Sequence, residues 1–213
     1  MNSASLKLAK LQDAWSNFKG GDFASLGILF EIHYQELFYY GIKIVALPEL
    51  VKDTIQDLFA DAWERRDKMV SVDNFKAYLI ISLRRELVRR INRIRKESSS
   101  DPLATLQFSF SPEDFLISDE ENRNHSRLLS QSMEGLTDRQ REVILLRFFH
   151  SLEFTEISQV LDMNIQSVRN LLFRSLEKIR KDMSDQGVTG VENVEMFLWF
   201  IFGQKNNKKL TSD

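Results

Sequence analysis

Apolar residues recur at helical spacing along most of this chain, and this pattern is what most limits the fold. The clearest case is a segment over residues 74–96 in which one helix face is apolar. That face consists of Leu79, Leu83, Leu87, Ile91 and Ile94. Three earlier segments have the same spacing, and only eight glycines and three prolines interrupt the 213 residues. The sequence therefore predicts an all-α protein.

Helix start and stop signals divide the first half of the chain. Gly20 and Gly21 end a first helix, and Asp22 is suited to cap the next one. We expect further helices over residues 23–46, 49–68 and 74–96, with Phe23 and Trp63 among the side chains that face inward. Four such helices predict a compact bundle-like domain over residues 1–96.

An acidic segment follows this first domain. Residues 97–122 carry seven acidic and no basic side chains, although the whole chain has a net charge of only −2. Three serines in a row at 98–100 and the prolines Pro102 and Pro112 interrupt any helical period there. We interpret residues 97–122 as an acidic linker between two helical domains.

The second half contains the spacing of a helix-turn-helix motif. Thr137 and Gln140 form a capping box for a helix to about residue 150. A short helix over residues 154–161, the turn Asp162-Met163-Asn164 and a helix over residues 165–182 follow. We expect a helix-turn-helix domain over residues 123–182 and a tail over residues 183–213.

The outward face of the second helix of this motif carries hydrogen-bonding and cationic groups near its N-terminal end. The outward positions are Gln166, Ser167, Arg169, Asn170, Phe173 and Arg174. Side chains near the start of a recognition helix contact base edges and phosphates, so this face predicts DNA binding. The alternative is an ordinary amphipathic hairpin with a solvated polar face.

Two rows of like charge lie on neighbouring segments of the first domain. Asp53, Asp57 and Asp61 recur at i, i+4 and i+8, and residues 84–96 carry seven cations against the single acid Glu86. The cations of interest are Arg84, Arg85, Arg89, Arg90 and Arg93. Like charges at this spacing repel, so a basic partner for the aspartates and a polyanion for the arginines are expected. Plain solvated faces are the alternatives.

The residue types exclude several classes of site. The chain has no cysteine, three histidines without metal-ligand spacing and no glycine-rich phosphate loop. We therefore expect no catalytic residues, no metal site, no cofactor and no enzymatic activity. His33 and His150 are expected to be packing or capping residues.

The apolar run over residues 194–202 is too short to span a membrane, and no secretory segment is expected at the N-terminus. We expect a cytoplasmic protein without stable membrane insertion. The run itself is expected to dock on one of the two domains, where it could restrain DNA binding. A contact with a partner or a membrane surface is the alternative.

Taken in order, these segments resemble a bacterial RNA polymerase sigma factor of the ECF (extracytoplasmic function) group, over about residues 20–96 and 123–181. Residues 53–63 are similar to the helix that binds the clamp helices of the polymerase β′ subunit. The resemblance implies that Asp53, Gln56, Asp57 and Asp61 contact core RNA polymerase. It also implies that Phe59 and Trp63 belong to the core.

The same resemblance assigns the other segments. The arginine row of residues 84–93 would stabilise the melted promoter element, and residues 66–73 would help to hold a flipped base. Residues 136–143 and the helix-turn-helix would read the upstream element, with Asp162 replacing the customary turn glycine. The partners implied are core RNA polymerase (β′ clamp helices and β flap), promoter DNA and an anti-sigma factor.

The implied function is a sigma factor that recognises promoters and promotes strand opening. Two alternatives come from the residues alone. One is a stand-alone helix-turn-helix regulator whose first domain senses a ligand or dimerises, and the other is an interaction module that has lost DNA binding.

Overall fold

The computed structural model describes residues 3–69, 74–97, 108, 120–186, 194–199 and 202. Every regular element in these ranges is a helix, which confirms the predicted all-α class. The chain divides into two compact units, residues 1–106 and 107–213. The proposed acidic linker lies mostly outside the described residues. Its last residues, from Glu120, already belong to a helix of the second unit.

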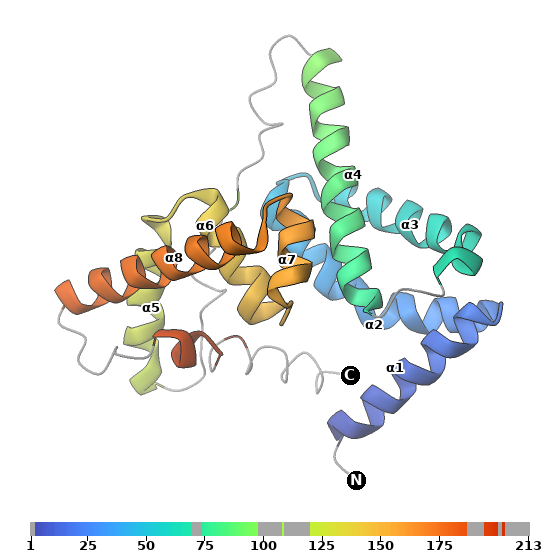
Figure 1. Ribbon diagram of the computed structural model, residues 1–213, viewed down its shortest axis with the longest axis horizontal. Coiled ribbons are helices and arrows are strands. Elements are labelled where there is room, and N and C mark those ends of the chain that lie inside the picture. The colour runs from blue at the N-terminus through green and yellow to red at the C-terminus, as the bar shows by residue number, and fades with distance from the viewer. Residues whose placement is uncertain are drawn as a thin grey trace. The chain divides into compact units, whose positions relative to one another are not determined.

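The first unit contains four α-helices and a short 3₁₀ helix. They are α1 (Ser3–Lys19), α2 (Phe23–Ile44), α3 (Pro48–Glu64), η1 (Arg66–Met69) and α4 (Phe75–Glu97). Helix α1 packs on α2, while α2, α3 and α4 all pack against one another (Figure 1). The bundle therefore agrees with the predicted arrangement, except that α3 ends at Glu64 and tightens into η1 before Lys68.

Local signals fix where these helices begin. The Asp22 carboxylate accepts hydrogen bonds from the backbone N–H groups of Ala24 and Ser25 at 3.3 and 3.1 Å. Pro48 occupies the first turn of α3, where its missing N–H costs nothing. The Asn74 side chain accepts a hydrogen bond from the N–H of Ala77 and so caps α4.

Aromatic rings fill the centre of the first unit. The rings of Trp15 and Phe75 stack with centroids 4.4 Å apart, and Phe18 lies 5.8 Å from Phe75. His33 is buried and meets Phe75 edge to face, which confirms its expected packing role. Through Phe75, α4 is thus held against both α1 and α2.

The contact between α2 and α3 depends on the missing side chain of Gly41. A Cβ atom at this position would lie 2.4 Å from Cγ1 of Val51, which is fully buried. We expect Gly41→Ala to lower the free energy of unfolding by about 1–3 kcal/mol, because the two helices must move apart. Urea unfolding followed by far-ultraviolet circular dichroism measures this change.

Gly27 on the same helix provides the control. A Cβ atom there meets nothing within 4 Å. We expect Gly27→Ala to raise stability by about 0.5–1 kcal/mol, because alanine loses less backbone entropy in a helix. Equal stabilities of the two variants would contradict the close approach of α2 and α3.

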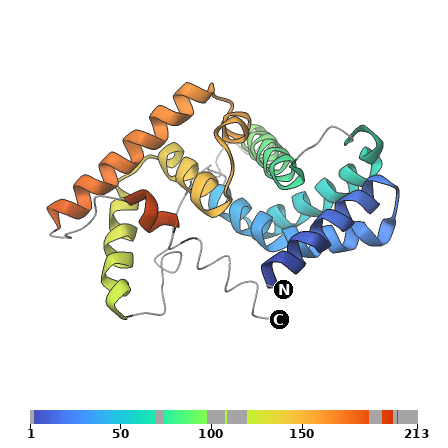
Figure 2. The same cartoon turned by 60° about the horizontal axis from the view of Figure 1, so that its bottom comes forward.

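The second unit is built around a long helix. Its elements are α5 (Glu120–Glu134), α6 (Asp138–Ile144), η3 (Leu145–Phe149), α7 (Phe154–Leu161) and α8 (Ile165–Asp185). Helices α5, α6 and α7 all pack against α8. Figure 2 shows α8 as the long orange helix of this unit. The predicted capping box is present, since Thr137 accepts from the N–H of Gln140.

The helix predicted to run from Thr137 to about residue 150 changes character halfway. Residues 145–149 form a π-helical turn, and the N–H of His150 donates to the carbonyl oxygen of Leu145 at 3.1 Å. Four of the five side chains in this turn are buried, and His150 is buried beside them. A wider turn carries more inward-facing side chains than a regular α-helical turn would.

A further short helix forms within the predicted apolar tail. Residues 194–199 are helical, and Val194, Leu198 and Phe202 are buried in the second unit. Within the described ranges, every helix falls short of the length and apolar character that a membrane span requires.

Candidate functional site

The helix-turn-helix motif has the geometry that its spacing predicts. Asp162 ends α7 in the left-handed conformation, with φ 53° and ψ 54°. Asp tolerates this region better than most residues, so the turn forms without a glycine. The side chain of Asn164 then accepts a hydrogen bond from the N–H of Ser167 at 2.7 Å and starts α8.

The structure gathers the predicted DNA-binding residues on one face of α8. Val168, Leu172 and Ile179 are buried against the unit, and the opposite face is open. Gln166, Arg169, Asn170, Phe173 and Arg174 are exposed, and Ser167 is half-buried. Gln166 donates a hydrogen bond to Asn170 at 3.1 Å, so these two amides form one polar surface. This face can offer donors, acceptors and cations to a DNA groove.

The aspartate row lies on the surface of α3. Asp53, Asp57 and Asp61 are all exposed, and the buried face of the helix carries Val51, Ile55, Leu58 and other apolar side chains. Gln56 is also exposed, but it directly precedes Asp57 and so lies beside the aspartate row rather than in it. An exposed acidic row of this kind can meet a basic helix of a partner.

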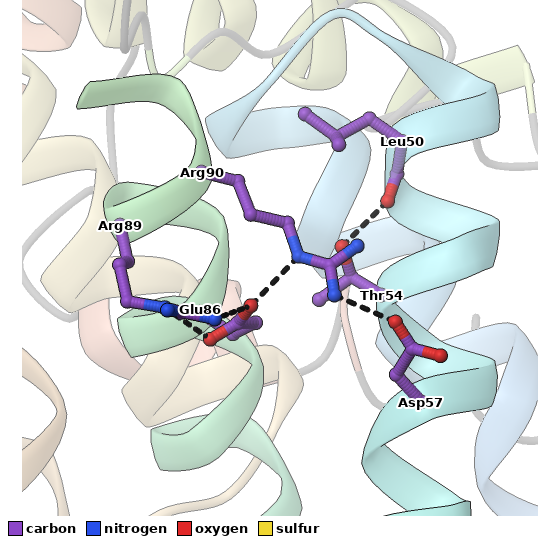
Figure 3. Close-up of polar contacts among 6 residues, drawn as sticks. All are labelled: Leu50, Thr54, Asp57, Glu86, Arg89 and Arg90. Carbon is purple, nitrogen blue, oxygen red and sulfur yellow. Dashed lines mark hydrogen bonds and ion pairs between the residues drawn. The ribbon is translucent and has the colours of Figure 1, made fainter. Parts of the chain in front are cut away.

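The arginine row of α4 is partly engaged by acids of its own unit. Arg90 donates to Asp57 of α3 at 2.6 Å and to Glu86 at 2.7 Å, and Arg89 also binds Glu86 (Figure 3). Arg85 and Arg93 are exposed, while Arg84 is half-buried. The two predicted surfaces therefore touch each other through the Asp57–Arg90 pair.

Glu86 is the centre of this cluster. Hydrogen bonds from Arg89, opposed by partial burial and reinforced by Arg90, lower the pKa of the Glu86 carboxyl to about 2. The group is therefore ionised throughout the neutral range. It neutralises part of the repulsion that the arginine spacing creates, and it leaves a smaller net positive charge on α4 than the count of cations indicates.

A groove with a volume of about 530 Å³ runs between α3 and α4. Asp57 and Asp61 line it from α3, while Arg85, Arg89 and Arg90 line it from α4. The acidic and the basic candidate surfaces thus border one groove. The charge pattern of the sequence did not predict the contact between Asp57 and Arg90, which are 33 residues apart.

A second, more apolar groove lies between α2 and α3, with a volume of about 630 Å³. Phe23, Trp63 and Gln56 are among the residues that line it. The Phe23 side chain is 67% exposed, so the expectation that it faces inward is wrong. Trp63 is half-buried, and its ring meets that of the buried Phe18 edge to face with centroids 5.9 Å apart. Phe23 is the first residue of α2, and its ring meets that of Trp63 edge to face with centroids 5.1 Å apart. Phe59 is buried as predicted.

Family models match both units of the chain. The model described as Sigma-70 region 2 matches residues 29–97, and the model described as Sigma-70, region 4 matches residues 126–179. The first match contains the aspartate and arginine rows. The second contains the helix-turn-helix.

Curated relatives belong to the same family. The RNA polymerase sigma factor YlaC of Bacillus subtilis (strain 168) is 24% identical over 164 residues, which cover 75% of this chain and 92% of that protein. The ECF RNA polymerase sigma-E factor of Escherichia coli (strain K12) is 26% identical over 141 residues, which cover 61% and 71%.

Solved structures share the fold. The sigma factor RpoE from Bartonella quintana, in complex with the anti-sigma factor NepR, aligns with a TM-score of 0.55 and 18% identity over 74% of this chain and 96% of that chain. CnrH, in complex with the cytosolic domain of CnrY, aligns with a TM-score of 0.50 and 18% identity over 83% and 98%. With both family regions matched in order and ECF factors among its relatives, the chain belongs to the sigma-70 family of RNA polymerase sigma factors, in the ECF group.

Proposed function

We propose that this sigma factor binds core RNA polymerase through the exposed face of α3 and promoter DNA through α4 and α8. The observation that carries the proposal is the placement of charge. The exposed carboxylates of Asp53, Asp57 and Asp61 lie along α3, and exposed guanidinium groups lie on α4 and on the open face of α8. Asp53, Gln56, Asp57 and Asp61 are the proposed contacts to the clamp helices of the β′ subunit, and the second unit is the proposed partner of the β flap.

The arginines of α4 are the proposed contacts to the melted strand. Guanidinium groups bind phosphates and stack on unpaired bases, and melting a base pair is repaid by such contacts. Arg85 and Arg93 are exposed for this role, and Arg84, Arg89 and Arg90 complete the row. No covalent step is required, so we propose that the chain acts by binding and without enzymatic activity.

The exposed face of α8 is the proposed reader of the upstream promoter element. Gln166, Ser167, Arg169 and Asn170 lie in the first two turns of the helix, where a recognition helix meets base edges. Phe173 and Arg174 lie one turn further and suit contacts to a thymine methyl group and to a phosphate.

Two further assignments concern a protein partner and the location of the chain. Because RpoE is found in complex with an anti-sigma factor, we propose an anti-sigma partner for this chain as well. Because its proposed target is core RNA polymerase, we place the chain in the cytoplasm. The stand-alone regulator is not favoured, because the first unit matches region 2 of the family rather than a sensor or dimerisation domain.

Reconstitution with bacterial core RNA polymerase tests the function. We expect the purified chain to co-elute with core enzyme in gel filtration and to direct run-off transcription from a subset of a randomised promoter library. Promoter binding should require core enzyme and weaken as salt is raised. A dimer that binds its operator duplex without polymerase would contradict the proposal and support the regulator.

A further inference from the structure

The C-terminal apolar helix is part of the core of the second unit. Its Trp199 ring meets Phe148 edge to face at 5.2 Å, and Phe202 meets Phe149 at 6.0 Å. Both phenylalanines belong to the π-helical turn η3. The match to region 4 ends at residue 179, so this helix adds a layer to the DNA-reading unit beyond the matched region.

Arg147 of the same turn is held between two aromatic rings. Its guanidinium carbon lies 5.1 Å from the ring centroid of Phe154 and 5.5 Å from that of Trp199. One amino group also donates to the carbonyl oxygen of Leu152 at 2.9 Å and approaches the Glu153 carboxylate at 3.3 Å. Its side chain is only 18% exposed. These contacts fix a cation between the C-terminal helix and the first residue of α7.

The ring of Phe154 contacts a second guanidinium group, that of Arg169. The Arg169 carbon lies 5.4 Å from the same ring centroid, and Arg169 is on the exposed face of α8. The contacts therefore form a continuous series from Trp199 to Arg147, Phe154 and Arg169. We call these four side chains the aromatic–arginine stack. Cation–π attraction of this kind is directional enough to favour one orientation of an arginine side chain.

We propose that the C-terminal helix acts through the aromatic–arginine stack to position Arg169 for promoter recognition. Trp199, Arg147 and Phe154 are then positioning residues, and Arg169 is the residue that contacts DNA. An arginine already held against a ring loses less side-chain freedom on binding, so its contact is stronger. This inference rests on the proposed role of α8 in DNA recognition. It replaces the expectation that the tail restrains DNA binding with the opposite effect.

A double-mutant cycle on the full chain tests the proposal. Holoenzyme binding is measured on the duplex that the wild-type holoenzyme selects from a randomised library. We expect Arg169→Ala to weaken binding about tenfold, in the range of one lost arginine contact. Trp199→Ala should weaken it about fivefold. Because the contact is already impaired in that background, adding Arg169→Ala should cost less than about threefold further.

Matched variants separate positioning from folding. Met196 lies on the same helix and is 66% exposed, so Met196→Ala should leave the full tenfold effect of Arg169→Ala. Phe154→Leu keeps an apolar side chain but removes the ring. Like Trp199→Ala, it should weaken DNA binding by itself and reduce the further effect of Arg169→Ala. Trp199→Phe should bind DNA as tightly as the wild type, because it retains a ring beside Arg147. All affinities are measured at a temperature well below the thermal unfolding midpoint of each variant, so that every variant is folded.

A measurement on the free chain is independent of polymerase. In ¹H–¹⁵N spectra of arginine side chains, the Nε–H signal of Arg169 should shift in Trp199→Ala and Phe154→Leu and stay unchanged in Met196→Ala. If no duplex is selected, the proposed function fails, while the spectra still test the stack. Strictly additive binding effects together with an unchanged Arg169 signal would overturn the inference.

Discussion

Asp53→Arg should reduce the affinity of the chain for core RNA polymerase by at least about 100-fold, which corresponds to about 2.7 kcal/mol. Asp53 is exposed on α3, so the substitution places a cation on the surface proposed to meet a basic coiled coil. Like charges brought together across an interface cost several kcal/mol. The affinity is measured by competition with a labelled wild-type chain for core enzyme.

The choice of Asp53 over its neighbours follows from the structure. Asp57 binds Arg90, so its reversal would also release a proposed DNA-binding side chain and mix two effects. Asp13 provides the matched control, since it is an exposed acid on α1, outside the region 2 match. Asp13→Arg should bind core enzyme like the wild type. If the Asp53→Arg and Asp13→Arg variants bind core enzyme with equal affinity, α3 is not part of the polymerase interface.

Arg85→Glu should reduce promoter opening about 10- to 100-fold while leaving binding to core enzyme intact. Among the described residues Arg85 forms no ion pair, whereas Arg89 and Arg90 already bind Glu86 and Asp57. Arg85 is therefore the side chain of this groove that is most available to a polyanion. Reversing its charge removes one phosphate contact and adds repulsion, so the salt dependence of opening should also fall by about one unit of slope.

Permanganate footprinting of the melted strand measures this effect across a series of salt concentrations. Lys10→Glu is the control, because Lys10 is an exposed cation on α1. Arg89→Gln should have a smaller effect than Arg85→Glu, since Arg89 is already bound to Glu86 and the substitution removes a charge without reversing it. If the Arg85→Glu variant opens promoters normally, the melted strand does not bind in this groove.

Local patterns predicted most of the helices because their causes are local. Asp22 and Thr137 cap helices through hydrogen bonds to neighbouring N–H groups, and Asp162 adopts its left-handed turn within the motif itself. The outward face of α8 also follows from helical spacing alone. These features depend on residues fewer than five positions apart, so one sequence is enough to reveal them.

The remaining features depend on how helices are rotated against one another. The Asp57–Arg90 pair joins α3 to α4, and the contact of Phe154 with Arg169 joins α7 to α8. Apolar spacing identifies the buried face of each helix but leaves open which polar side chains meet across the boundary. Phe23 shows the converse, since an apolar residue at a helix end can remain outside the core.

The π-helical turn at Leu145–Phe149 contains Arg147, so its backbone geometry determines where that side chain points. Its i→i+5 hydrogen bond accommodates one residue more than an α-helical turn. Deleting one residue of the turn before Arg147, at position 145 or 146, would rotate the Arg147 side chain by about 100° around the helix axis. A different side chain would then face the ring of Phe154 in place of Arg147. A single backbone irregularity thus determines which chemical group links the end of the chain to its promoter-reading surface.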